Sequence, residues 1–123
     1  MNIIRNLKKL TDSCVKHFDE LKVDEKVSLL TINLESQSIW GGNGDRDKDL
    51  HFYVNENGLY STTIIQEYGM YQKGNGVIDK KTSRAEISEI ENALNGEYAT
   101  LFDVESFINF YNTIRKKYPE DFK

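Results

Sequence analysis

Four regularly spaced carboxylates form the pattern in this chain that comes nearest to a known chemistry. Asp45, Asp47 and Asp49 alternate with other residues, and Glu56 is the twelfth residue counted from Asp45. Calcium loops of the EF-hand type place carboxylates at positions 1, 3, 5 and 12, so that their oxygens converge on one cation. Position 6 of such a loop is Gly, whereas here it is Leu50. We therefore expect a solvated acidic loop and no bound metal ion.

A thiol and an imidazole form a second candidate pair. Cys14 and His17 are three residues apart in a predicted helix, which would place them on one face. A thiolate beside an imidazole is the start of a nucleophilic site. Cys14 also belongs to an apolar stripe, where a cysteine usually acts as a small hydrophobic residue. We therefore predict no catalytic residues.

Two glycine-rich segments resemble phosphate-binding loops only in composition. Residues 41–44 and 74–76 lack the Gly-Lys-Ser/Thr sequence that opens a helix in such a loop. The two histidines and one cysteine have no zinc-site spacing. No cofactor is therefore expected.

Aromatic residues lie close in sequence to the acidic ones over residues 40–73. Tyr and Trp are favoured at protein interfaces because they bury a large area at little entropic cost. An alternative is that most of these rings close the core or cover a sheet edge. We interpret the acidic and aromatic segment as an interface, with the predicted partner-binding residues Trp40, Asp45, Asp47, Asp49, Glu56, Glu67, Tyr68 and Tyr71.

The elements that must position these residues follow from hydrophobic spacing. Apolar residues at three- and four-residue intervals predict a helix over residues 3–21. Strands are predicted over 27–34, 50–54 and 59–67, with short additional strands at 39–40 and 69–72. Residues 35–38 and 73–76 are predicted turns, residues 41–49 a loop, and the Asn-Gly pair within 55–58 a hairpin turn.

Two helices are predicted after the strands. Ser83 with Glu86 has the pattern of a capping box, and Gly96 is placed where that helix would end. Asp103 is the predicted cap of the last helix, which Pro119 ends. This order of elements predicts one α+β domain over residues 1–123, with an N-terminal helix and an antiparallel sheet of three to five strands. The two C-terminal helices would pack on one face of the sheet and leave the other open.

Composition and charge disfavour some classes of function and favour others. The 123 residues carry a net charge of −4, and residues 27–79 carry all of it, with three basic and seven acidic side chains. Mild acidity disfavours direct nucleic-acid binding and favours a basic partner. No apolar run is long enough for a membrane helix, and one cysteine allows no internal disulfide. These features predict a cytoplasmic protein without a membrane partner.

In size, acidity and α+β pattern, the chain resembles the immunity proteins of bacterial contact-dependent inhibition and polymorphic toxin systems. This resemblance implies a protein that binds a cognate toxin, often a basic nuclease domain, and occludes its active site. Two alternatives stay open: a small enzyme that uses a carboxylate in a sheet-lined pocket, and a regulatory or structural subunit that homodimerises through the sheet. The expected oligomeric state is a monomer or a weak homodimer.

Overall fold

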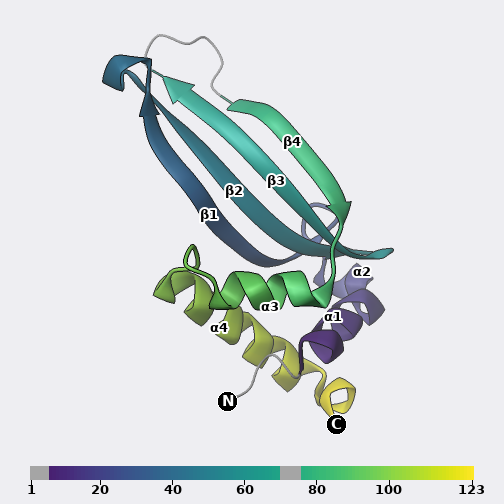
Figure 1. Ribbon diagram of the computed structural model, residues 1–123. Coiled ribbons are helices and arrows are strands. Elements are labelled where there is room, and N and C mark those ends of the chain that lie inside the picture. The colour runs from purple at the N-terminus through teal and green to yellow at the C-terminus, as the bar shows by residue number, and fades with distance from the viewer. Residues whose placement is uncertain (1–5, 70–75) are drawn as a thin grey trace.

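The computed structural model describes residues 6–69 and 76–123, and its elements form one meandering antiparallel sheet with helices on one side (Figure 1). The strands are β1 (Val27–Ile39), β2 (Gly44–Asn55), β3 (Gly58–Gly69) and β4 (Gly76–Arg84), paired in that order. The α+β prediction is therefore confirmed, with four strands.

Helices precede and follow the sheet. The N-terminal ones are α1 (Leu7–Lys16) and α2 (Phe18–Leu21), and the C-terminal ones are α3 (Ile87–Asn95) and α4 (Leu101–Lys117), followed by the short 3-10 helix η3 (Pro119–Phe122). The predicted helix over 3–21 is thus divided at His17, and its first residues lie outside the described part of the chain. None of the described helices has the length and apolar character needed to cross a lipid bilayer.

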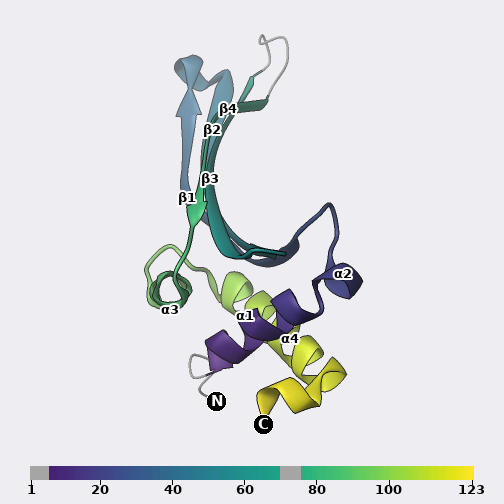
Figure 2. The same ribbon diagram turned by 90° about the vertical axis from the view of Figure 1, so that its right-hand side faces the viewer.

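The sheet bends strongly along its strands, as Figure 2 shows. Helices α1, α3 and α4 lie against the convex side of the end that carries the β2–β3 hairpin. The far half of the sheet, beyond the helices, extends away from them (Figures 1 and 2). We call the side of β2 that carries Phe52 and Val54 the covered face, and the side that carries His51 and Tyr53 the open face.

The core lies between the covered face and the helices. Phe52, Val54, Leu10, Phe107 and Tyr111 are each at most 1% exposed. Burying large apolar side chains from both layers is the main contribution that holds the helices on the sheet. The remaining buried apolar residues of the cluster are Leu7, Cys14, Phe18, Val27, Leu29, Leu30, Ile32, Leu59, Ile90 and Ile114.

The β2–β3 hairpin forms where the sequence predicts it. Asn55 pairs with Gly58, and the backbone N–H of Asn57 donates to Oδ1 of Asn55 at 2.8 Å. Gly58 has a φ of 125°, a backbone conformation that residues with a side chain rarely adopt. The strands predicted at 50–54 and 59–67 lie within β2 and β3.

Two predictions for the far half of the sheet are wrong. Residues 35–38 continue β1 instead of turning, and most of the predicted loop over 41–49 belongs to β2, which begins at Gly44. The chain reverses through the 3-10 helix η2 (Trp40–Gly42) instead. Both strands are polar on both sides here, because no helix covers them, so they lack the apolar alternation that identifies a strand. The strand predicted at 69–72 and most of the turn at 73–76 lie outside the described residues.

The helix caps also differ from the sequence prediction. Ser83 lies in β4, and the capping box of α3 is formed by Glu86 and Glu89. Thr100 is the N-cap of α4, and Asp103 is the third helical residue, whose carboxylate accepts from the Thr100 N–H at 3.0 Å. Gly96 ends α3 as predicted, with a φ of −84° and therefore without a left-handed conformation.

Candidate functional site

The open face of the sheet carries a row of three carboxylates. Asp45, Asp47 and Asp49 occupy alternate positions of β2, so their side chains project from the same face. We call these three residues the aspartate row. Their cross-strand neighbours confirm the face: Oδ1 of Asp49 accepts from Nδ2 of Asn33 at 2.9 Å, and Oδ1 of Asp47 accepts from Oγ of Ser36 at 2.7 Å.

The basic residues between the aspartates project from the opposite face. Arg46 and Lys48 alternate with the aspartates along β2. Nη2 of Arg46 lies 3.0 Å from Oε2 of Glu67 on β3, to which it is bonded. Strand geometry therefore separates the two signs of charge, which a flexible loop would have mixed. Among the described residues, no ion pair involves the aspartate row.

The other predicted partner-binding residues do not lie together on one surface. Tyr68 pairs with Asp45 across the sheet and is 38% exposed, so it extends the aspartate row on the open face. Glu67 faces the other side, where it binds Arg46. Glu56 lies at the tip of the β2–β3 hairpin, at the opposite end of β2. Trp40 begins η2, and Tyr71 lies outside the described residues.

The four carboxylates of the calcium pattern therefore do not converge. Successive members of the aspartate row are spaced by about 6.7 Å along the strand. A calcium ion needs its oxygens at about 2.3–2.6 Å. Within residues 6–69 and 76–123, no group of three or more His, Cys, Asp or Glu side chains is arranged to hold a metal ion.

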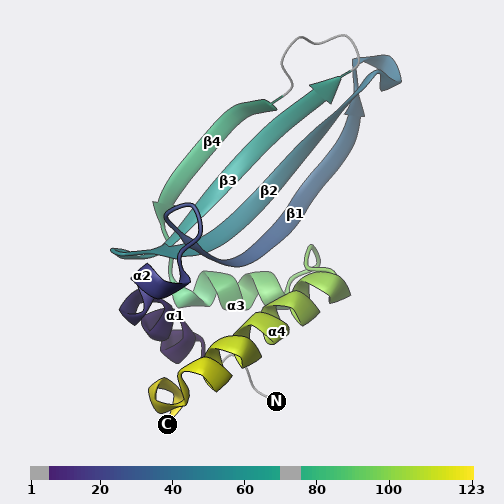
Figure 3. The same ribbon diagram turned by 180° about the vertical axis from the view of Figure 1, so that it is seen from behind.

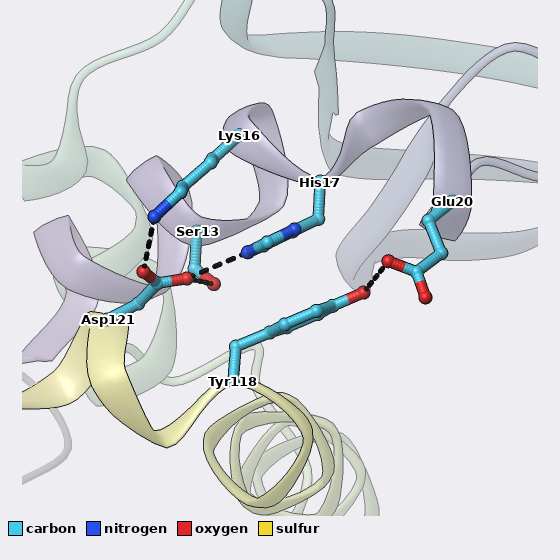
Figure 4. Close-up of polar contacts among 6 residues, drawn as sticks. All are labelled: Ser13, Lys16, His17, Glu20, Tyr118 and Asp121. Carbon is cyan, nitrogen blue, oxygen red and sulfur yellow. Dashed lines mark hydrogen bonds and ion pairs between the residues drawn. The ribbon is translucent and has the colours of Figure 1, made fainter.

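A second polar cluster joins the two ends of the chain (Figure 4). Oγ of Ser13 donates to Oδ2 of Asp121 at 2.8 Å, Nε2 of His17 lies 3.0 Å from the same oxygen, and Nζ of Lys16 lies 3.0 Å from Oδ1. These contacts, led by the Ser13 hydrogen bond, lower the pKa of Asp121 from 3.8 to about 2. The carboxylate thereby ties η3 to α1.

An aromatic stack extends this cluster. The His17 ring stacks on Tyr118 with centroids 3.6 Å apart and planes within 3°. The Tyr118 hydroxyl donates to Oε2 of Glu20 at 2.5 Å. Burial first, and then this hydrogen bond, raise the pKa of Tyr118 to about 12. No pattern in the sequence predicted the cluster, since its two halves are about a hundred residues apart in the chain.

This cluster is not arranged as a nucleophilic site. Ser13 is only 1% exposed, and its hydroxyl donates to the carboxylate rather than to the imidazole. The neighbouring thiol is also unsuited to attack, because Cys14 is fully buried and burial raises its pKa to about 12. Cys14 therefore acts as a core residue, as the apolar stripe predicted, and His17 contacts Asp121 and Tyr118.

Comparisons with known proteins add no relative: no family model, curated protein or solved structure matches the chain.

Proposed function

We propose that this chain is a protein-binding inhibitor of the immunity-protein type, which neutralises a basic, nuclease-type toxin domain by covering its active site. The observation that carries the proposal is the aspartate row on the open face. Its carboxylates accept hydrogen bonds from neutral Asn33 and Ser36, so their charges are not cancelled by neighbouring cations in the described chain.

The aspartate row, on the far half of the sheet, is accessible to a protein partner. The helices lie at the other end and on the other side of the sheet, so they do not cover the aspartate row (Figure 2). Lysine and arginine side chains that hold nucleic-acid phosphates in a nuclease would meet a row of carboxylates instead. Tyr68, beside Asp45, adds an exposed aromatic ring of the kind that anchors protein interfaces.

The partner can be sought by affinity capture of the tagged chain in its native host, followed by a toxicity assay. We expect a stoichiometric basic protein that stops growth when produced alone, and whose toxicity co-production of this chain relieves. A captured protein that is harmless when produced alone, or whose toxicity is not relieved, would contradict the proposal.

The role of the aspartate row is then tested with two variants of equal charge. The first replaces Asp45, Asp47 and Asp49 by Asn. The matched control, Asp79→Asn with Glu97→Gln and Glu105→Gln, changes three exposed acids outside the predicted partner-binding residues. At low salt, we expect the first variant to associate about five-fold more slowly than the control, since local charge steers encounter. Equal association rates would exclude the row as the binding surface.

A further inference from the structure

The open face also contains a polar pocket, which lies toward the β2–β3 hairpin and adjoins the aspartate row at Ile64, the cross-strand partner of Asp49. Its volume is about 300 Å³. The turn that precedes β1 passes in front of the sheet, as Figure 3 shows, and residues 24–26 of this turn line the pocket. The lining residues come from that turn and from β2, β3 and β4: Asp24, Glu25, Lys26, His51, Tyr53, Asn55, Thr62, Ile64 and Lys80.

The turn that borders the pocket has an unusual backbone. Val23 and Lys26 exchange two backbone hydrogen bonds, at 2.9 and 3.3 Å. The two residues between them, Asp24 and Glu25, have φ values of 54° and 64°. Positive φ at both central positions is the pattern of a type I′ turn, which Asn-Gly normally fills. The turn therefore places Lys26 beside the sheet, although Asp24 and Glu25 are not the residues that normally form this turn type.

Two lysines of the pocket have no carboxylate partner among the described residues. Nζ of Lys26 lies 5.7 Å from the centre of the Tyr53 ring and takes part in no ion pair. Lys80 projects from β4 opposite Ile64, on the open face, and also takes part in none. The hydroxyls of Thr62 and Tyr53 lie 3.4 Å apart beside them. The Thr62 hydroxyl donates to Tyr53 and is also bonded to Thr82 at 2.9 Å, so the donors left for an oxyanion are the two ammonium groups and the Tyr53 hydroxyl.

His51 lines the same pocket as Lys26. Its Nε2 lies 3.1 Å from Oγ of Ser28, and its pKa is lowered first by burial and then by the positive charge of Lys26. No carboxylate contributes to this shift, although several acids lie near. Asp24 and Glu25 are exposed at the rim, with Glu25 3.8 Å from Lys22, and Asp49 is bonded to Asn33.

We infer that this pocket binds an oxyanion, the phosphate or carboxylate group of a ligand, between Lys26 and Lys80. The bound group would be the anionic partner that both lysines lack, and it would also accept a hydrogen bond from the Tyr53 hydroxyl. This inference does not depend on the proposed function, because the binding of an oxyanion needs no protein partner and none of the three residues of the aspartate row lines the pocket.

The test is a titration of the folded chain with inorganic phosphate, at constant ionic strength kept with chloride, followed by the NMR signals of the histidine rings. We expect a saturable shift of the His51 signals and a rise of the His51 pKa, since a bound anion favours the imidazolium form. His17, bonded to Asp121 at the other side of the molecule, is an internal reference that stays unchanged.

Neighbouring lysines on β4 provide a matched pair of variants. Lys80→Gln should weaken phosphate binding about ten-fold, the effect of losing one charge-assisted hydrogen bond. Lys81→Gln has the same net charge but alters the other face, where Lys81 pairs with Thr63, and should leave the affinity within about two-fold. Lys26→Gln should weaken binding as Lys80→Gln does.

Acetate in place of phosphate distinguishes the source of the anion. Tighter binding of phosphate indicates a phosphorylated ligand, whereas equal affinities indicate a carboxylate, and both results support an oxyanion site. A His51 shift that grows linearly without saturating would overturn the inference, as would equal losses of affinity in Lys80→Gln and Lys81→Gln. Either of these results would leave the toxin-binding proposal standing.

Discussion

The strained turn before β1 provides a prediction that needs no partner. Glu25 occupies a left-handed conformation, with a φ of 64°, at the turn position where glycine is preferred. A residue with a side chain costs about 1–2 kcal/mol in that region, and glycine recovers this at an entropic cost of about 0.5–1 kcal/mol. Glu25→Gly should therefore raise the free energy of unfolding by about 1 kcal/mol.

The expected change in melting temperature follows from the size of the chain. An unfolding entropy of about 2.1 cal/mol/K per residue, over 123 residues, gives roughly 0.26 kcal/mol/K. One kcal/mol then corresponds to a rise of about 4 °C. The ion pair of Glu25 with Lys22 spans 3.8 Å between exposed side chains, so its loss contributes little. Differential scanning calorimetry and urea unfolding measure both quantities.

Glu25→Ala is the control for this prediction. It removes the same carboxylate but keeps a Cβ in the left-handed region, so its melting temperature should stay near that of the wild type. If the alanine variant is stabilised as much as the glycine variant, the effect comes from the side chain and the backbone argument is wrong. A glycine variant that is less stable than the wild type would refute it as well.

Three further predictions concern the core and the Asp121 cluster. Because the pKa of Asp121 is lowered from 3.8 to about 2, its stabilising effect is present above pH 4 and is lost as the pH falls toward 2. Asp121→Asn should therefore flatten the fall in urea stability between pH 4 and pH 2, and an unchanged slope would contradict this role. The Cys14 thiol, fully buried with a pKa of about 12, should resist iodoacetamide at pH 8 until urea unfolds the chain, as mass spectrometry would show. Fast labelling of the native protein would mean that α1 opens readily. Phe107→Ala, at a site 1% exposed between α4 and the sheet, should cost about 3–5 kcal/mol in urea unfolding, and a loss below 1 kcal/mol would show that this packing matters little.

Local signals predicted the parts of the fold that local physics controls. The Asn-Gly hairpin was found because a tight turn depends on its own residues, here above all on Gly58, which adopts the positive φ. Helix α4 was found because Phe107, Tyr111 and Ile114 face the core at helical spacing, although the apolar residues of its first turn are exposed. The strands 50–54 and 59–67 were found for the same reason, as one side of each faces the helices.

Strand β4 escaped sequence analysis because eight of its nine residues are exposed. Its polar residues resemble a loop, and it exists because its backbone pairs with β3. The far ends of β1 and β2 are likewise polar and are likewise held in the sheet by backbone pairing. Backbone pairing between distant segments leaves no mark on side-chain periodicity, so sequence reasoning misread these segments as turns and loops.

The candidate sites also combine features that the sequence determines with features that only the fold determines. The sequence by itself determined that Asp45, Asp47 and Asp49 alternate with Arg46 and Lys48, and that the middle of the chain is acidic. Whether the acidic and basic side chains of residues 45–49 lie close enough to neutralise one another depends on the conformation of their backbone. Pairing of β2 with both of its neighbours fixes an extended strand, whose side chains must alternate between two faces. Only the tertiary structure therefore decided that the acids share one face, while Lys26 and Lys80, 54 positions apart in the sequence, line one pocket on it.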